Sequence, residues 1–494
     1  MKTKLIILFY ISLLLNSLSY GKDSLTNRVS LQKFSLRKSE PVDSIINDLK
    51  IFIPKYIKEQ NIPGISTALV YNNQIVWTDG FGFTNSITKN PVDTNTLFEV
   101  ASNSKAITAY ISLKLVDEGK LSLDKPLLSY LSQEWMPYSI YQDSIKLKHV
   151  LSHSSGLART KREIMFKPGS AYFYSANGFN LLMEVMEETT GETFEELAQR
   201  LVFQPLGMKN SSFVKQDELL ELTANGHIHA IAPVAVFGLS YLVLFLITSL
   251  IGLLIIKWST KSWKLRRIHR FIFIILPVAL AAAILFIILG KVSFFEFAYI
   301  ILIAGFAVLT IFLILFHVVR VLIFRTARKK IPQRVFSLFW GLLLIGLIVF
   351  TSMKVRNLPI PSWPNYKASP AGTLRTTSGE LALFMLELAN PKYLKVETAK
   401  NLSTSQIKLA ENLSWGMGQG IFYGEQGYAL WQWGQHIDFQ SMMIIYPQSG
   451  FGIVVCTNND LFNPDVALEI AQRALGVNID TIRAAIHLKY DYSQ

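Results

Sequence analysis

Two short, mainly apolar runs that are separated by two polar residues predict a β-hairpin in the first part of the chain. These runs are residues 66–71 and 74–77, and the pair Asn72-Asn73 separates them. Asparagine tolerates the left-handed backbone conformation that two-residue hairpin turns require. We therefore expect two antiparallel strands that are joined at these asparagines.

The pattern changes to a helical period soon afterwards. Residues 111–116 keep this period, and the pattern ends near Glu118-Gly119. Extrapolated backwards, the helix begins at Ser102, and Lys105 lies one turn later on the same face. Residues 428–441 predict a strand, a tight turn and another strand, with Gln432-Trp433-Gly434 in the middle.

Four long apolar stretches follow one another in the middle of the chain, at residues 231–256, 271–290, 297–319 and 335–353. Each is close to the roughly 20 residues that an α-helix needs to cross the hydrocarbon core of a membrane. None of the four contains Asp, Glu, Lys or Arg. The pattern therefore predicts a four-helix transmembrane insertion at residues 230–353, which divides the flanking domain into residues 22–229 and 354–494.

The net charge of +13 is concentrated in two of the loops between these stretches. The loops contain Lys257, Lys261, Lys264, Arg266, Arg267 and Arg270 in one case, and Arg320, Arg325, Arg328, Lys329, Lys330 and Arg334 in the other. Short basic loops stay on the cytoplasmic side of a membrane. The charge thus indicates topology and lipid contact rather than nucleic-acid binding, and it predicts that both flanking parts face the extracytoplasmic, or periplasmic, side.

The N-terminal 21 residues and the cysteine content narrow the picture further. Residues 1–21 combine Lys2 and Lys4 with an apolar run and small residues at Ser19 and Gly21, as a secretory signal peptide does. Cys456 is the single cysteine, which excludes an intramolecular disulfide and a cysteine-based zinc site. We predict no metal and no cofactor.

The spacing of Ser102 and Lys105 has a chemical use. A serine hydroxyl is a weak nucleophile unless a base stands beside it. A buried lysine can be that base, because burial disfavours the ammonium form and lowers the pKa. The first N–H groups of a helix also point toward developing negative charge. Alone, a Ser-x-x-Lys spacing is equally compatible with a capping serine and an exposed lysine.

Four further segments help to interpret the pair Ser102 and Lys105. In order, they are residues 115–126 (LVDEGKLSLDKP), 150–157 (VLSHSSGL), 167–182 (KPGSAYFYSANGFNLL) and 369–381 (SPAGTLRTTSGEL). Together with residues 98–105 (FEVASNSK), they resemble the serine β-lactamase and penicillin-binding family, in its class C β-lactamase-like branch. The resemblance extends over both flanking parts. It implies a mixed α/β domain in which an antiparallel sheet lies beside a helical lobe.

The resemblance also implies roles for individual residues. Ser102 would be the acylated nucleophile, Lys105 its base, and Tyr174 the group that relays a proton to the leaving group. The backbone N–H groups of Ser102 and Gln435 would form the oxyanion hole. Alternatively, Tyr174 is an aromatic residue of the core without a role in proton transfer.

Two motifs depart from the family pattern. The family's second motif is commonly Tyr-x-Asn, but Ala176 stands in the asparagine position and Asn177 follows one residue later. The third motif, usually Lys-Thr/Ser-Gly or His-x-Gly, falls on Gln432-Trp433-Gly434, which carries no cation. His436 shares a strand face with Gln432 and Gly434 if the strand extends that far.

The sequence thus predicts a membrane-anchored serine hydrolase that forms an acyl-enzyme on an amide or ester. A cell-wall peptide that contains D-amino acids is one candidate substrate, and carboxypeptidase or esterase activity is favoured over β-lactamase activity. The alternative is a weakly acylating or non-catalytic receptor for wall fragments or β-lactams, which signals through the membrane helices. The partners expected are a small-molecule or peptide substrate and the lipid bilayer, but not nucleic acid; the oligomeric state stays open.

Overall fold

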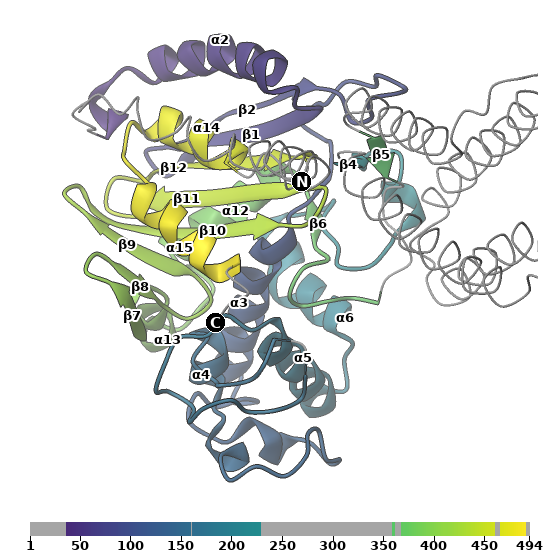
Figure 1. Cartoon of the computed structure of the whole chain (residues 1–494), viewed down its shortest axis with the longest axis vertical. Helices are drawn as coiled ribbons and strands as arrows, with labels where there is room; N and C mark the ends of the chain where they lie inside the picture. Colours follow the sequence, from purple (N-terminus) through teal and green to yellow (C-terminus); the bar gives the residue numbers. More distant parts are fainter. Residues whose placement is uncertain (1–35, 160, 229–357, 361–366, 460–464, 491–494) are drawn as a thin grey trace, which may run out of the picture.

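A computed structural model describes residues 36–159, 161–228, 358–360, 367–459 and 465–490. The centre of the structure is an eight-stranded antiparallel sheet, with strand order β2-β1-β12-β11-β10-β9-β8-β7 (Figure 1). Its strands are β1 (Gly64–Tyr71), β2 (Gln74–Gly82), β7 (Ile407–Ala410), β8 (Leu413–Trp415), β9 (Gly420–Gly424), β10 (Gly427–Gln435), β11 (Gln440–Tyr446) and β12 (Phe451–Thr457). Two short pairs stand beside it: β3 (Phe98–Glu99) with β6 (Arg375–Thr376), and β4 (Gly226–Ile228) with β5 (Leu358–Ile360).

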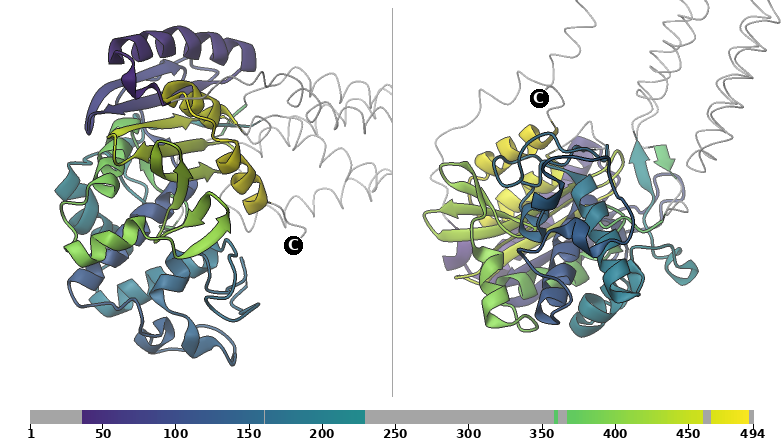
Figure 2. Two further views of the ribbon diagram at one scale, coloured as in Figure 1. Left: turned by 90° about the vertical axis from the view of Figure 1, so that its left-hand side faces the viewer. Right: turned by 90° about the horizontal axis from the view of Figure 1, so that it is seen from below.

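Helices surround this sheet. The longer ones are α2 (Val42–Gln60), α3 (Ser104–Asp117), α5 (Ala176–Thr190), α12 (Ser378–Ala389), α14 (Val466–Leu475) and α15 (Asp480–Tyr490). Shorter helices and turns are η1 (Arg37–Ser39), η2 (Ala101–Asn103), η3 (Leu127–Tyr130), η4 (Gln142–Ser144), α4 (Leu147–Leu151), α6 (Phe194–Ala198), η5 (Gln199–Phe203), α7 (Gln204–Leu206), η6 (Asp217–Leu219), α13 (Val396–Lys400) and η8 (Asn401–Ser403). Figure 2 shows the helical lobe, drawn in blue and teal, beside the sheet.

The hairpin predicted from the two apolar runs and the Asn72-Asn73 turn is confirmed. Tyr71 pairs with Gln74, and the two residues between them, Asn72 and Asn73, have φ values of 52° and 59°. Both asparagines therefore adopt the left-handed conformation that matches the twist of a two-residue hairpin. The predicted helix is also present, because η2 and α3 together run from Ala101 to Asp117.

The two faces of the sheet are covered by different helices. On one face, α2 and α14 pack against apolar strand residues such as Ile444 and Trp433. On the other face, α3, α5 and α12 share a core with residues such as Leu430 and Val454. Because side chains alternate along a strand, the even-numbered positions of β10 face α3. This places Gln432 and Gly434 on the side of the sheet where Ser102 lies.

The chain on both sides of residues 229–357 builds one sheet. β1 lies between β2 and β12, so the second strand beside β1 comes from the far end of the chain. β4 and β5 pair antiparallel, with Gly226 opposite Ile360, so the described residues on the two sides of the interval 229–357 lie next to each other. The interval itself, including the predicted insertion at 230–353, lies outside the described residues, and the domain boundaries at 229 and 354 stay predictions.

The structure corrects the membrane part of the prediction. Among the described residues, no helix combines the length and the apolar composition that a membrane crossing requires. The longest of them, α2, has 19 residues but carries charged side chains such as Asp48 and Lys50. A fold interrupted by four transmembrane helices and a multi-pass membrane location are therefore not supported, whereas the mixed α/β fold is. The four apolar stretches and the signal peptide at 1–21 lie outside the described residues.

Packing between the sheet and α14 can be tested with one truncation. Ile444 is fully buried on β11, so Ile444→Ala should lower the free energy of unfolding by about 2–5 kcal/mol, the usual loss for a large-to-small core change. Ile51 on α2 is 72% exposed and serves as the matched control. Ile51→Ala should change the free energy of unfolding by less than about 0.5 kcal/mol. Urea unfolding of the full chain measures both values. Equal losses for the two variants would contradict the packing.

Candidate active site

Ser102 lies where strand β3 turns into helix α3, and the residue before it has an unusual backbone conformation. The preceding residue, Ala101, has a φ of 46°, which is uncommon for a residue that carries a Cβ atom. Asn103 donates its side-chain amide to Ser441 Oγ at 2.7 Å, and Ser441 Oγ donates to the carbonyl of Val100, also at 2.7 Å. Strand β11 thus fixes the turn from both sides of Ser102, which is only 7% exposed.

Lys105 is buried directly beneath this serine. Its Nζ atom lies 3.1 Å from Ser102 Oγ and 2.7 Å from the carbonyl oxygen of Ala371, and the residue is 2% exposed. Burial lowers the pKa of the amine to about 7, because the charged form loses its hydration. Near neutral pH, a substantial fraction of Lys105 is therefore an uncharged amine that can accept a proton from the adjacent hydroxyl.

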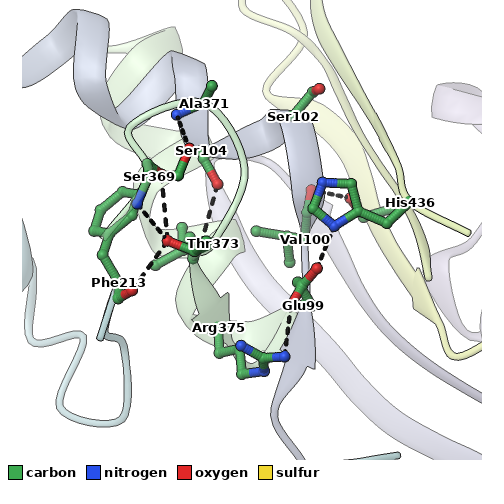
Figure 3. Close-up of polar contacts among 12 residues, drawn as sticks. Glu99, Val100, Ser102, Ser104, Phe213, Ser369, Ala371, Thr373, Arg375 and His436 are labelled. Carbon is green, nitrogen blue, oxygen red and sulfur yellow. Dashed lines mark hydrogen bonds and ion pairs between the residues drawn. The ribbon is translucent and has the colours of Figure 1, made fainter. Parts of the chain in front are cut away.

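The loop that carries Ala371 is held by hydrogen bonds, as Figure 3 shows. Thr373 Oγ1 donates to the carbonyl of Phe213 at 3.0 Å and accepts from the N–H of Ser369 at 2.8 Å. Thr108 of α3 donates to the carbonyl of Pro370 at 2.7 Å. The Ala371 carbonyl is thereby fixed in front of Lys105. This backbone acceptor was not anticipated from the sequence, because any residue type can supply it.

Tyr174 lies in the loop before α5, close to Lys105. The Lys105 Nζ atom is 5.0 Å from the centre of the Tyr174 ring, and the phenolic oxygen is buried. His153 stacks on the same ring at a centroid distance of 4.2 Å and accepts a hydrogen bond from the N–H of Ser175 at 3.3 Å. His153 itself has a φ of 54°. The structure therefore brings Ser102, Lys105 and Tyr174 together and adds His153 as the residue that supports the tyrosine loop.

The edge of β10 faces this group. Gln435 pairs with Gln440, and the N–H of His436 donates to the carbonyl of Phe439 at 2.9 Å. Antiparallel ladders alternate between hydrogen-bonded and non-hydrogen-bonded pairs, so the Gln435 N–H points away from β11. On that side β9 has already ended, since its first residue, Gly420, pairs with Trp431. The Gln435 N–H is thus oriented away from the ladder, as an oxyanion-hole donor must be.

Gly434 allows the backbone before Ser102 to lie directly on β10. A Cβ atom at Gly434 would stand 2.0 Å from the Val100 carbonyl oxygen, so a larger residue would displace the turn that carries the serine. Gln432 is fully buried on the same face of the strand. Its Nε2 donates to the Gly418 carbonyl at 3.3 Å, and its Oε1 accepts from the N–H of Trp433 at 3.1 Å.

Asn177, the residue next to the family's asparagine position, lies in the first turn of α5. Its amide nitrogen donates to the carbonyl of Lys161 at 2.7 Å, and the residue is 7% exposed. In this structure, the amide therefore connects α5 to the loop that contains Lys161. Substrate contacts by Asn177 and Gln432, and the catalytic roles of the other predicted residues, stay predictions.

Sequence reasoning missed a buried charge cluster on the other side of Val100. Glu99 forms an ion pair with Arg375 at 2.5 Å and a short contact with Nδ1 of His436. Burial alone would raise the pKa of Glu99, but Arg375 and His436 bring it below its ordinary value. Burial would likewise lower the pKa of His436, but the Glu99 carboxylate raises it. Asp438 lies nearby, and burial followed by the Glu99 charge raises its pKa to about 7.

Burial of Lys105 has a measurable consequence for stability. The amine has a pKa near 7 in the folded chain and near 10.5 when it is exposed, so unfolding takes up a proton between these values. The stability of the wild type should therefore rise with pH relative to Lys105→Met, by up to about 1.4 kcal/mol per pH unit between pH 7.5 and 9.5. Urea unfolding of both proteins at several pH values measures the difference. A constant difference across this range would mean that Lys105 keeps its charge in the fold.

Comparisons with known proteins agree with this geometry. Residues 49–236 match the profile of the family named Beta-lactamase. The Protein flp of Staphylococcus aureus (strain N315) is 26% identical over 209 residues, which are 37% of this chain and 42% of that protein. A putative penicillin-binding protein, PbpX of Bacillus subtilis (strain 168), is 28% identical over 216 residues, which are 40% and 52% of the two chains. The chain thus spans about half the length of these curated relatives.

Solved structures share the fold. The octameric penicillin-binding protein homologue of Pyrococcus abyssi aligns with a TM-score of 0.55 at 18% identity, over 87% of this chain and 76% of the other. The D-alanine carboxypeptidase AmpC of Burkholderia cenocepacia aligns with a TM-score of 0.55 at 13% identity, over 88% and 99%. Identities this low show the fold alone. Together with the Beta-lactamase profile match over residues 49–236, they show a β-lactamase-like mixed α/β fold, similar to that of penicillin-binding proteins and class C β-lactamases.

Proposed function

We propose that this protein hydrolyses an amide or ester through an acyl-enzyme on Ser102. One observation carries the proposal: the buried amine of Lys105 lies 3.1 Å from Ser102 Oγ and has a pKa near the pH at which a general base works best. A lysine that served only for packing or solubility would keep its charge at the surface. Placing it beneath a serine at a helix start costs free energy, and a catalytic base accounts for that cost.

The first half of the reaction follows from these positions. The uncharged Lys105 amine accepts the Ser102 proton as Oγ bonds to the substrate's carbonyl carbon. The carbonyl oxygen then becomes negative, and the N–H groups of Ser102 and Gln435 would stabilise it. When the carbon–nitrogen or carbon–oxygen bond breaks, the leaving group takes up a proton through Tyr174, which lies against Lys105.

The second half regenerates the enzyme. A water molecule gives up a proton to the same basic groups and attacks the ester on Ser102. The acid product leaves, and Ser102 recovers its proton. The relatives named as penicillin-binding proteins and as a D-alanine carboxypeptidase favour a D-amino-acid peptide as the substrate class. Acylation without the second half would make the protein a receptor that is labelled but does not turn over.

A covalent probe tests the nucleophile. A fluorescent fluorophosphonate, or a fluorescent penicillin, should label the wild-type chain and leave Ser102→Ala unlabelled, because the hydroxyl oxygen forms the bond. Ser112→Ala, a buried serine of α3 that bonds the Ala109 carbonyl at 2.7 Å, is the matched control. In-gel fluorescence measures the outcome. If Ser102→Ala were labelled as strongly as the wild type, the acyl-enzyme would have to form elsewhere.

The pH dependence of labelling tests the base. With the neutral fluorophosphonate, the rate should rise about tenfold per pH unit below the pKa of Lys105, near 7, and level off above it, because only the uncharged amine accepts a proton. In Lys105→Arg the guanidinium stays protonated, so the rate should fall by roughly 10²–10⁴-fold and lose this rise. Stopped-flow fluorescence measures both proteins. A rate that is independent of pH in the wild type would exclude Lys105 as the base.

A further inference from the structure

The third motif of this chain carries no cation, but the charge cluster of Glu99, Arg375 and His436 lies close to it. Gln432 occupies the position where the family carries a charge, and its amide is already bonded to Gly418 and Trp433. A substrate carboxylate would find no positive charge on that side chain. His436 follows four residues later on the same strand face, just beyond the end of β10.

The His436 ring lies between the cluster and the loop that holds the base. Its Nδ1 atom contacts Glu99 of β3, as Figure 3 shows. A Cβ atom at Gly372 would stand 2.9 Å from the other ring nitrogen, Nε2, so only a glycine lets the ring approach so closely. The residue before that glycine is Ala371, whose carbonyl binds Lys105. The imidazole is therefore a direct neighbour of the segment that positions the base.

When His436 is protonated, its positive charge is in excess of the Glu99–Arg375 ion pair. Arg375 neutralises Glu99, and both side chains are almost completely buried, at 2% and 6% exposure. The His436 side chain is 39% exposed, so it is the member of the group that a solute can reach. Because the contact with Glu99 holds a proton on Nδ1, an imidazolium at this position keeps its Nε2–H for another acceptor.

We propose that His436 is the specificity-determining cation of this site and that it receives a carboxylate of the substrate beside the bond that Ser102 attacks. This inference rests on the proposed function. It names the substrate class as acyl donors with a free carboxylate on the leaving-group side. Glu99 and Arg375 are positioning residues in this arrangement, since they act on the substrate only through the imidazole.

The surrounding charges make this recognition sensitive to pH. Glu99 on β3 favours the imidazolium, Arg375 on β6 balances that carboxylate, and Lys105 on α3 opposes the positive charge. Asp438, in the same turn as His436, has a pKa of about 7, so it is largely protonated below that pH and becomes negative above it. As pH rises, His436 loses its proton and Asp438 gains charge. Both changes weaken the attraction for a carboxylate.

A matched pair of dipeptides tests the inference. N-acetyl-D-alanyl-D-alanine carries the carboxylate, and its C-terminal amide differs only in lacking it. At pH 6.5 the wild type should prefer the free acid in kcat/KM by about tenfold, as expected for a charge-assisted contact that is partly exposed to solvent. This preference should fall to near unity in His436→Gln. It should return in His436→Lys and then stay constant up to pH 9, where the wild type loses it.

A control variant accounts for the change in total charge. Lys55 lies on α2, its side chain is 73% exposed, and the helix covers the opposite face of the sheet. Lys55→Gln removes one positive charge, as His436→Gln does in acid, and it should leave the preference for the free acid unchanged. Equal preferences in the wild type, His436→Gln and His436→Lys would overturn the inference while leaving hydrolysis at Ser102 intact.

A binding measurement separates the two proposals when turnover is too slow to measure. Ser102→Ala cannot form the acyl-enzyme, so calorimetry with the same dipeptides reports recognition alone. The acid should bind about tenfold more tightly than the amide at pH 6.5, and the double variant Ser102→Ala/His436→Gln should lose this difference. If wild-type Ser102 is not acylated but the binding difference appears, the proposed hydrolysis fails and the role of His436 stands. If the two ligands bind equally in Ser102→Ala, the role of His436 is overturned.

Discussion

Keeping the amine of Lys105 out of water is the constraint on which the rest of this structure depends. An ammonium group is strongly hydrated, so its burial is unfavourable unless the group loses its proton or finds partners. Here it has two oxygen neighbours, the Ser102 hydroxyl and the Ala371 carbonyl, and the aromatic rings of Tyr174 and Phe179 close the remaining sides. These neighbours come from several parts of the chain, so the fold must bring distant segments to one point before the amine can change its pKa.

Local patterns were enough to predict two elements of the fold. The hairpin at Asn72-Asn73 and the helix that presents Ser102 and Lys105 both follow from residues that are close in sequence, because turn conformation and helical period are local properties. The spacing of Ser102 and Lys105 alone was ambiguous, and the order of the other motifs resolved it. The mixed α/β fold followed from the same resemblance. The roles assigned to Gln435, Gln432 and Asn177 stay predictions.

What the sequence did not reveal depends on contacts between distant residues or on the backbone. Glu99 contacts His436, which is 337 residues away in the sequence, and the periodicity of neither segment predicts this contact. The Ala371 carbonyl, 266 positions from Lys105, belongs to the backbone, and a backbone acceptor has no residue type to be recognised by. The membrane interpretation was based on hydropathy in residues 231–353. The described helices are shorter or more polar than a crossing requires, as α2 illustrates.

The pairing of β1 with β12 determines when the central sheet can form during synthesis. During synthesis, Ser102 and Lys105 leave the ribosome more than two hundred residues before Ala371, β10, β11 and β12. Until then the sheet lacks its central strands, and Lys105 lacks the acceptor and the cover that lower its pKa. The surroundings of Ser102 and Lys105 are therefore complete only near the end of translation, and their formation requires slow, non-local folding. A truncated chain would contain Ser102 and Lys105 without these surroundings, so under the proposed function incomplete synthesis would yield a fragment that cannot form the acyl-enzyme.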